Sequence, residues 1–375
     1  MKSSSYKLKT KKKNLRKIKP FKSIKSIKSI KSIKSLKSLK IKKCSNSSNF
    51  RILNGINNIT INNKVLNQLI KKLNDNNEFL DGSGCIAFSP NHLILAITGY
   101  NKESLDNDNN TNKTIRLWDI SNMNIHSNIS KILHHKILSG HTYIISSIAW
   151  SYDSKILASS SWDTTVILWN TETYKQLKVL QGHSSYVNSV VWIPNTKKLI
   201  SGGLDNIINI WDVSNHNKVL APTILKGHTN SINSLSCSPN GKILASASND
   251  KTIRLWNLKT SNLIHQLKGH KNYINSIIWN QEGNKLASAG NDNIIYIWNL
   301  SNISNFNKIQ SPNLLECYYG IKSLSWITNS SILTSICHNI NNKLMILWDI
   351  EKKNKLCFLK DEQKMNLYVS WFNVP

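Results

Sequence analysis

Serine, histidine and aspartate recur in this chain at fixed spacings. Four segments each place a His 22 residues before an Asp, with a Ser four residues before the same Asp. These three side chains form the catalytic triad of many hydrolases, in which the His takes a proton from the Ser hydroxyl and the Asp orients the His. An enzyme gains nothing from the same nucleophile repeated at identical offsets. We therefore predict that these residues are structural and that none is catalytic.

Each of these sets also includes a Trp, six residues after the Asp. The four sets are His141, Ser159, Asp163 and Trp169; His183, Ser201, Asp205 and Trp211; His228, Ser246, Asp250 and Trp256; and His270, Ser288, Asp292 and Trp298. They follow one another at intervals of 42 or 45 residues, a period typical of a four-stranded propeller blade.

The residues between these side chains predict the strands that position them. An alternating apolar run follows each Gly-His pair, for example residues 143–150, and indicates a half-buried strand. A second strand, rich in Ala, Ser and Gly, ends just before the Asp. The Asp then lies in a tight turn, and a third strand ends on the Trp. The repeat therefore predicts an all-β chain.

His, Ser, Asp and Trp at these offsets resemble the signature of the WD-repeat family. The resemblance implies a hydrogen-bond network within each blade, in which Trp donates to Ser, Ser reaches His and His bonds the turn Asp. Each buried polar atom that lost its partner would cost about 1–3 kcal/mol. The resemblance implies a single β-propeller that serves as an interaction scaffold, without naming its partner.

Six blades are visible in the sequence, and the outer two depart from the signature. The first begins at Gly84 and lacks the Gly-His pair, and the sixth has Cys317 at the His position and Asn342 at the Asp position. Residues 367–375 resemble a first strand, and residues 51–73 resemble the remaining strands of a blade. We expect seven blades rather than six, because a seventh shared between the two ends would remove the exposed sheet edges.

Charge divides the chain into three parts. Residues 1–43 contain seventeen Lys, one Arg and no acidic residue, which supplies +18 of the formal net charge of +29. We expect this segment to be a disordered low-complexity tail. Residues 44–80 form a polar, Asn-rich segment that we expect to contribute strands to the closing blade, and residues 81–375 form the propeller. The tail has the charge to attract nucleic acid or another polyanion, and a targeting signal is the alternative.

Several functional classes are disfavoured by what the sequence lacks. The six Cys show no C-x-x-C spacing and no zinc-ligand pattern, so we expect a reducing intracellular compartment, either cytoplasm or nucleus. No apolar run has membrane-spanning length, and no glycine-rich phosphate loop or H-E-x-x-H motif occurs. We expect no cofactor, no metal, no small-molecule substrate and no membrane span.

In the WD-repeat family, partners commonly bind the narrower face, where the loops before the first strands and the turns after the second strands converge. Three repeat positions map to this face. Immediately before the Asp lie Trp162, Leu204, Asn249 and Asn291; three residues after the His lie Ile144, Tyr186, Ser231 and Tyr273; and five residues after it lie Ser146, Asn188, Asn233 and Asn275.

These positions combine aromatic residues with a ring of amides, as expected of a protein-binding surface. Trp162 is the first candidate, because the repeat gives it no role in the fold; the alternative is packing against a neighbouring loop. The Asn positions also reflect a chain that is rich in Asn throughout. We predict a non-catalytic scaffold that binds protein segments on the narrow face. The alternative is a nucleic-acid or ribonucleoprotein component that binds phosphate through its tail.

Overall fold

The computed structural model describes residues 85–91, 93–99, 113–119, 121, 135–215, 221–301, 311–327, 329–339 and 342–360. The predicted tail, the Asn-rich segment and both parts of the predicted seventh blade lie outside these residues. Within the described ranges every regular element is a β-strand, so the predicted all-β class is confirmed. No helix in this part of the chain is long and apolar enough to span a membrane.

The strands form six antiparallel sheets of four strands each, which we number blades 1 to 6 in chain order. Blade 1 contains β1 (Ile86–Phe88), β2 (Ile94–Gly99), β3 (Thr114–Asp119) and β4 (His135–Ser139). Blade 2 contains β5 (Ile145–Trp150), β6 (Ile156–Ser161), β7 (Val166–Asn170) and β8 (Gln176–Leu180). Blade 3 contains β9 (Val187–Trp192), β10 (Lys198–Gly203), β11 (Ile208–Asp212) and β12 (Thr223–Leu225).

The last three blades follow the same order. Blade 4 contains β13 (Ile232–Cys237), β14 (Ile243–Ser248), β15 (Thr252–Asn257) and β16 (Leu263–Lys268). Blade 5 contains β17 (Ile274–Trp279), β18 (Lys285–Gly290), β19 (Ile294–Asn299) and β20 (Asn313–Glu316). Blade 6 contains β21 (Ile321–Trp326), β22 (Ile332–Asn339), β23 (Asn342–Asp349) and β24 (Asn354–Lys360). In each blade, consecutive strands are hydrogen-bonded neighbours.

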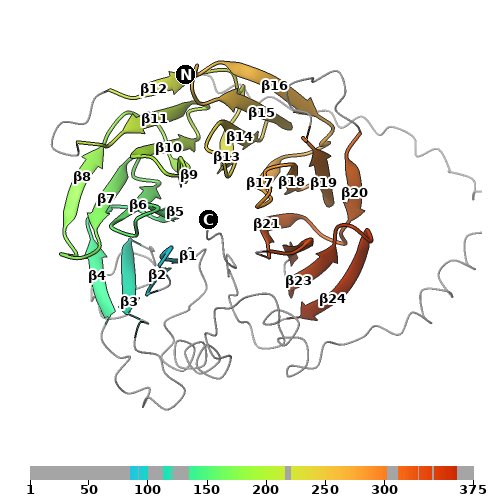
Figure 1. Ribbon diagram of the computed structural model, residues 1–375, viewed down its shortest axis with the longest axis horizontal. Coiled ribbons are helices and arrows are strands. Elements are labelled where there is room, and N and C mark those ends of the chain that lie inside the picture. Colours follow the sequence, from blue (N-terminus) through green and yellow to red (C-terminus); the bar gives the residue numbers. More distant parts are fainter. Residues whose placement is uncertain are drawn as a thin grey trace, which may run out of the picture. The chain divides into compact units, whose positions relative to one another are not determined.

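Consecutive blades contact one another through their first strands. β5 packs against β9, β9 against β13, β13 against β17 and β17 against β21. Figure 1 shows the blades following one another around a common axis, with the first strand of each blade innermost and the fourth outermost. The loops of all these blades are therefore presented at the two ends of the axis.

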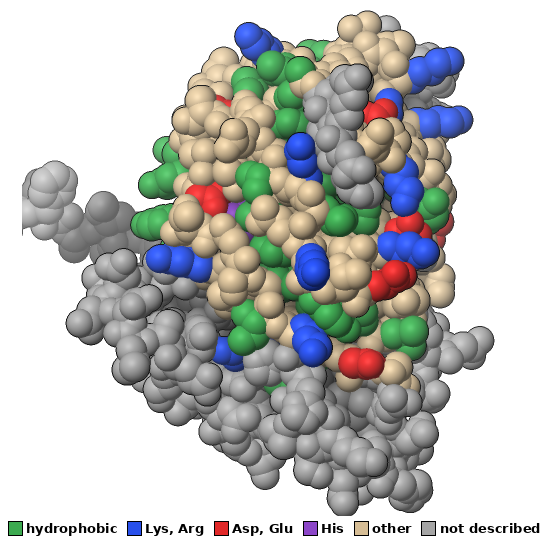
Figure 2. Space-filling model, turned by 90° about the vertical axis from the view of Figure 1, so that its left-hand side faces the viewer, with side chains coloured by type: hydrophobic (Ala, Val, Ile, Leu, Met, Phe, Trp, Pro, Cys, Tyr) green, Lys and Arg blue, Asp and Glu red, His purple; other side chains and the backbone are tan. Residues whose placement is uncertain are grey.

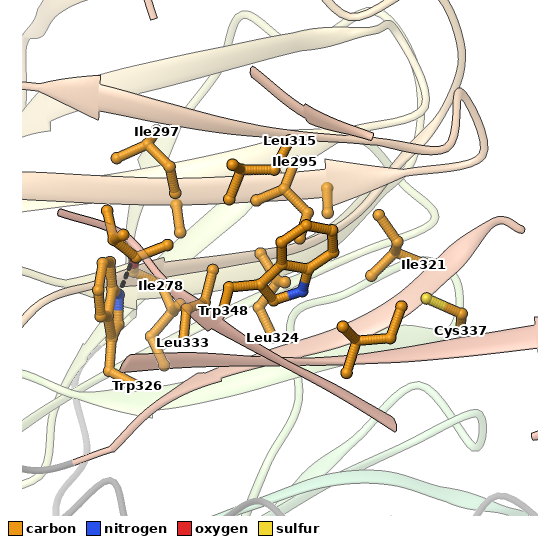
Figure 3. Close-up of a cluster of buried hydrophobic side chains, with 14 residues drawn as sticks. Ile278, Ile295, Ile297, Leu315, Ile321, Leu324, Trp326, Leu333, Cys337 and Trp348 are labelled. Atoms are coloured by element: carbon orange, nitrogen blue, oxygen red, sulfur yellow. Dashed lines mark hydrogen bonds between the residues drawn. The ribbon is translucent and has the colours of Figure 1, made fainter. Parts of the chain in front are cut away.

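The hydrophobic core lies between the blades. Five clusters of buried apolar side chains each join one blade to the next in chain order, from blades 1 and 2 through to blades 5 and 6. Figure 3 shows the cluster between blades 5 and 6, where the Trp326 indole donates to the carbonyl of Ile278 at 3.4 Å. Small residues such as Ala287, which is fully buried, leave room for the large side chains of the adjacent blade.

Candidate partner-binding face

Four side chains are hydrogen-bonded in series within each of blades 2 to 5. In blade 4, Trp256 Nε1 donates to Ser246 Oγ at 2.9 Å, this hydroxyl lies 2.8 Å from His228 Nε2, and His228 Nδ1 lies 2.7 Å from Asp250 Oδ2. The same three distances in the other blades are 2.8–2.9, 2.8 and 2.7 Å. The Asp carboxylate can only accept, so the His donates to it from Nδ1. Nε2 of the His then accepts from the Ser hydroxyl, and each group in the series has a partner.

The Asp carboxylates are fully engaged by their own blades. Burial opposes the ionisation of Asp163 and Asp250, but hydrogen bonds from His141 and His228 and from nearby Thr side chains outweigh it and hold the pKa of both carboxyls well below the usual range. Burial likewise opposes ionisation of Asp292, and its hydrogen bonds lower its pKa. In all four blades the Ser side chain is completely buried, so no substrate can reach its hydroxyl.

Blade 6 keeps only part of this series. Trp348 Nε1 donates to Ser335 Oγ at 2.8 Å, across 13 residues of sequence rather than the 10 found in blades 2 to 5. Cys317 occupies the position of the His, and its thiol interacts with that of Cys337. The Ser of this blade therefore accepts a hydrogen bond from the Trp indole but has no His beside it.

The His and Asp side chains lie at the same end of each of blades 2 to 5, and we call this end of the blades the His–Asp face. It consists of the loops that precede the first strands and the turns between the second and third strands. Backbone hydrogen bonds join the two segments in each blade, from Trp162 to Ile144 and from Leu204 to Tyr186. Asn249 and Asn291 bond Ser231 and Tyr273 in the same way. Two of the three predicted sets of binding positions therefore lie side by side.

The third predicted set connects the blades to one another. Asn188, Asn233 and Asn275 each donate a side-chain N–H to the carbonyl of the first residue in the next blade, at 2.8–2.9 Å. The Ser146 hydroxyl makes the equivalent bond to Val187. These four side chains thus have a structural partner at the junction between blades, whatever else they contact.

Removing one of these junction bonds should weaken the propeller. Asn233→Ala deletes the donor to the carbonyl of Ile274 and to Asn249 Oδ1, and we expect the free energy of unfolding to fall by about 1–2 kcal/mol. Asn262→Ala is the matched control, because Asn262 is exposed in a turn of the same blade, and we expect a change within about 0.5 kcal/mol. Equal losses in urea unfolding of the two variants would show that the junction bond contributes nothing.

Three aromatic rings stack on one another where blades 2 and 3 meet on this face. The rings of Trp162 and Tyr186 are 5.3 Å apart between centroids and tilted by only 7°. Tyr143 lies 6.1 Å from Trp162 and 6.2 Å from Tyr186. Tyr143 and Tyr186 remain 41% and 40% exposed, and Leu204 beside them is 43% exposed. Trp162 is thus packed by its neighbours within a patch that is open to solvent.

Glycine makes room for the Tyr backbone in two of the blades. The residue two positions before the Asp is Gly203 in blade 3 and Gly290 in blade 5, and a Cβ at either would collide with the carbonyl of Tyr186 or Tyr273. In blade 2 the same position is Ser161, whose hydroxyl donates to the Tyr143 carbonyl at 3.1 Å. The alternation between Gly and Ser therefore follows the backbone path of the preceding loop.

Sequence reasoning missed Tyr143 as a member of the face. Its ring belongs to the stack, yet it lies two residues after the repeat His, one position before those that were mapped. The one signal available was its residue type, because the other blades have Ser or Asn at this offset. Tyr273, predicted for the face, is 43% exposed and lies in blade 5, away from blades 2 and 3.

The comparison with known families agrees with the repeats of the structure. The family described as "WD domain, G-beta repeat" matches residues 132–170, 174–212, 221–257 and 261–299. Each match runs from the outermost strand of one blade to the third strand of the next. The sequence matches none of the curated proteins with which it was compared.

Proposed function

We propose that this chain, in which four segments between residues 132 and 299 match the WD-repeat family, is a non-catalytic scaffold that binds a segment of a partner protein on its His–Asp face. WD40 repeats generally mediate protein–protein interaction, and their propeller is typically a scaffold without catalysis. The repeated polar residues are committed to the fold. The residues that differ between blades are therefore the ones available for recognition.

The observation that carries this proposal is the aromatic stack of Tyr143, Trp162 and Tyr186. Aromatic side chains are enriched among the residues that dominate binding energy, and they lose little conformational entropy when they are already packed. The exposed Leu204 extends the same apolar patch across blade 3. A patch of this kind on a folded surface is typical of a protein interaction site.

Trp162→Ala should therefore reduce partner capture, and Tyr152→Ala should not. Truncating a central aromatic residue costs about 2 kcal/mol or more at a binding hot spot, which corresponds to at least about a 30-fold loss of affinity. Tyr152 is 45% exposed and lies in the turn before β6, at the opposite end of blade 2. The full chain and both variants would be used for affinity capture from native cells, with nuclease treatment and quantitative mass spectrometry.

Partners that bind the wild type and Tyr152→Ala, but not Trp162→Ala, would support the scaffold. A partner set that is unchanged by Trp162→Ala would refute it. A second candidate function rests on the +18 charge of residues 1–43, which would hold nucleic acid through its phosphates. Loss of most partners on nuclease treatment, or on deletion of residues 1–43, would favour this candidate.

A further inference from the structure

The His–Asp face changes character between blade 3 and blade 4. The residue immediately before the Asp of the hydrogen-bonded series is Trp162 in blade 2 and Leu204 in blade 3, but it is Asn249 in blade 4 and Asn291 in blade 5. The aromatic stack and Leu204 thus give an apolar half, on blades 2 and 3. The chemistry of blades 4 to 6 on the same face is set by amides and lysines.

The hydrogen-bond network fixes which way the amides point. The carbonyl of Ile274 can only accept, so Asn233 must present its Nδ2 there, and the second hydrogen of that group goes to Asn249 Oδ1 at 2.6 Å. Asn275 is placed in the same way and donates to Asn291 Oδ1 at 2.8 Å. The side-chain oxygens of Asn249 and Asn291 therefore both accept a hydrogen bond from the neighbouring Asn. Their NH₂ groups, which make no hydrogen bond to any described residue, are left as donors.

Lysines add positive charge to this half of the face. Lys251 lies in the turn after Asp250, Lys271 follows the His of blade 5, and Lys322 lies at the start of β21. Lys226 and Lys268 stand at the ends of neighbouring outer strands. All five are exposed, and none forms an ion pair with a described residue.

The acceptors of this half are largely used by the fold. Asp250 and Asp292 each bind a His and backbone N–H groups. Glu316, at the end of β20, is the exposed carboxylate on this half of the face among the described residues. Donors and positive charge therefore exceed free acceptors and negative charge here.

We propose that the His–Asp face binds an acidic peptide segment with one large apolar side chain. The apolar side chain packs on Tyr143, Trp162 and Tyr186, while the carboxylates lie against the amides of Asn249 and Asn291 and the lysines around them. This proposal rests on the proposed scaffold function and adds the chemistry of the partner. Charge complementarity is what selects an acidic segment over a neutral one.

The geometry of the stack favours a peptide over single-stranded nucleic acid. Proteins that hold single strands present separate aromatic platforms, on which successive bases stack. Here the three rings lie within 6.2 Å of one another and stack on each other, so they form one contact patch. One patch of this kind accommodates one anchoring side chain.

The test uses the full chain and fluorescein-labelled synthetic peptides. One peptide has Asp and Glu around a single Phe, a second replaces the acids by Asn and Gln, and a third replaces the Phe by Ala. A labelled oligothymidylate is the fourth probe. Fluorescence anisotropy would compare the wild type with Trp162→Ala, with Lys251→Gln/Lys271→Gln, and with the control Lys242→Gln/Lys259→Gln, whose lysines are exposed at the opposite end of blade 4.

The acidic Phe peptide should bind the wild type and the control alike. Its affinity should fall about tenfold or more in Trp162→Ala and in Lys251→Gln/Lys271→Gln. The positive tail is the same in every variant, so its attraction for polyanions cancels from these comparisons.

Two results would overturn the proposal. One is affinity for the acidic peptide that is unchanged in both face variants, and the other is a loss confined to the oligothymidylate. If Trp162→Ala still abolishes capture of native partners while acidic and neutral peptides bind equally, the scaffold stands and the acidic chemistry falls. Loss of both readouts would reject the two together.

Discussion

Replacing Ser246 by alanine is expected to lower the free energy of unfolding by about 3–4 kcal/mol, because it leaves two buried groups without a partner. These groups are the indole N–H of Trp256 and Nε2 of His228, which lie 2.9 and 2.8 Å from the hydroxyl. Ser335→Ala in blade 6 is the matched control, since Ser335 is equally buried and accepts from the indole of Trp348, but its remaining partners are the thiols of Cys317 and Cys337 and not a His. We expect this variant to lose about 1–2 kcal/mol.

Urea unfolding of both variants would measure the difference. A larger loss in Ser246→Ala assigns the excess to the His and to the rest of the series behind it. Equal losses would mean that the His–Ser contact adds nothing to stability. The identification of these residues as a stabilising network would then be wrong, even though their distances suit hydrogen bonds.

Acid is expected to destabilise the propeller below about pH 4. The carboxyls of Asp163, Asp250 and Asp292 have a lowered pKa in the folded state, while Asp in an unfolded chain titrates near pH 3.9. A lowered folded pKa contributes stability above the unfolded value, and this contribution is lost as the pH falls through the folded value. The melting temperature should therefore be nearly constant between about pH 7 and 5 and fall steeply below about pH 4.

Asp292→Asn separates this effect from general acid sensitivity. The variant keeps the size of the side chain but cannot ionise, so it should melt below the wild type at neutral pH. The gap between the two should narrow as the pH falls, because the wild type loses the same ionised group. A gap that is independent of pH between about 7 and 3 would show that ionisation of Asp292 does not stabilise the fold.

The architecture was predictable because its signal is carried by residue types at fixed spacings. The repeat located the first three strands of blades 2 to 5, and the two irregular blades were identified by their remaining strands and by the Trp that ends the third strand. The same positions are matched by the WD-repeat family or form four-stranded sheets in the structure. The predicted seventh blade stays a prediction, because both of its parts lie outside the described residues.

The site was less accessible to sequence reasoning, and the Asn positions show why. Their offsets were identified, but the partner of Asn233 is the backbone carbonyl of Ile274, and a carbonyl has no residue type. The contact between the free thiols of Cys317 and Cys337 could not be predicted for a different reason, since 20 residues and a strand separate the two cysteines. Only the structure brought Tyr143 into contact with Trp162 and Tyr186.

The junction bonds bear on how such a chain can change over evolutionary time. Donor and acceptor occupy the same two repeat positions at each junction from blade 2 to blade 6, with Ser146, Asn188, Asn233 and Asn275 as the donors. If a whole repeat is duplicated or deleted, the new neighbours still bring a matching donor and acceptor together. The number of repeats can therefore change by whole repeats without leaving a buried polar group unpaired. A gain or loss of part of a repeat would instead separate the donor from its acceptor.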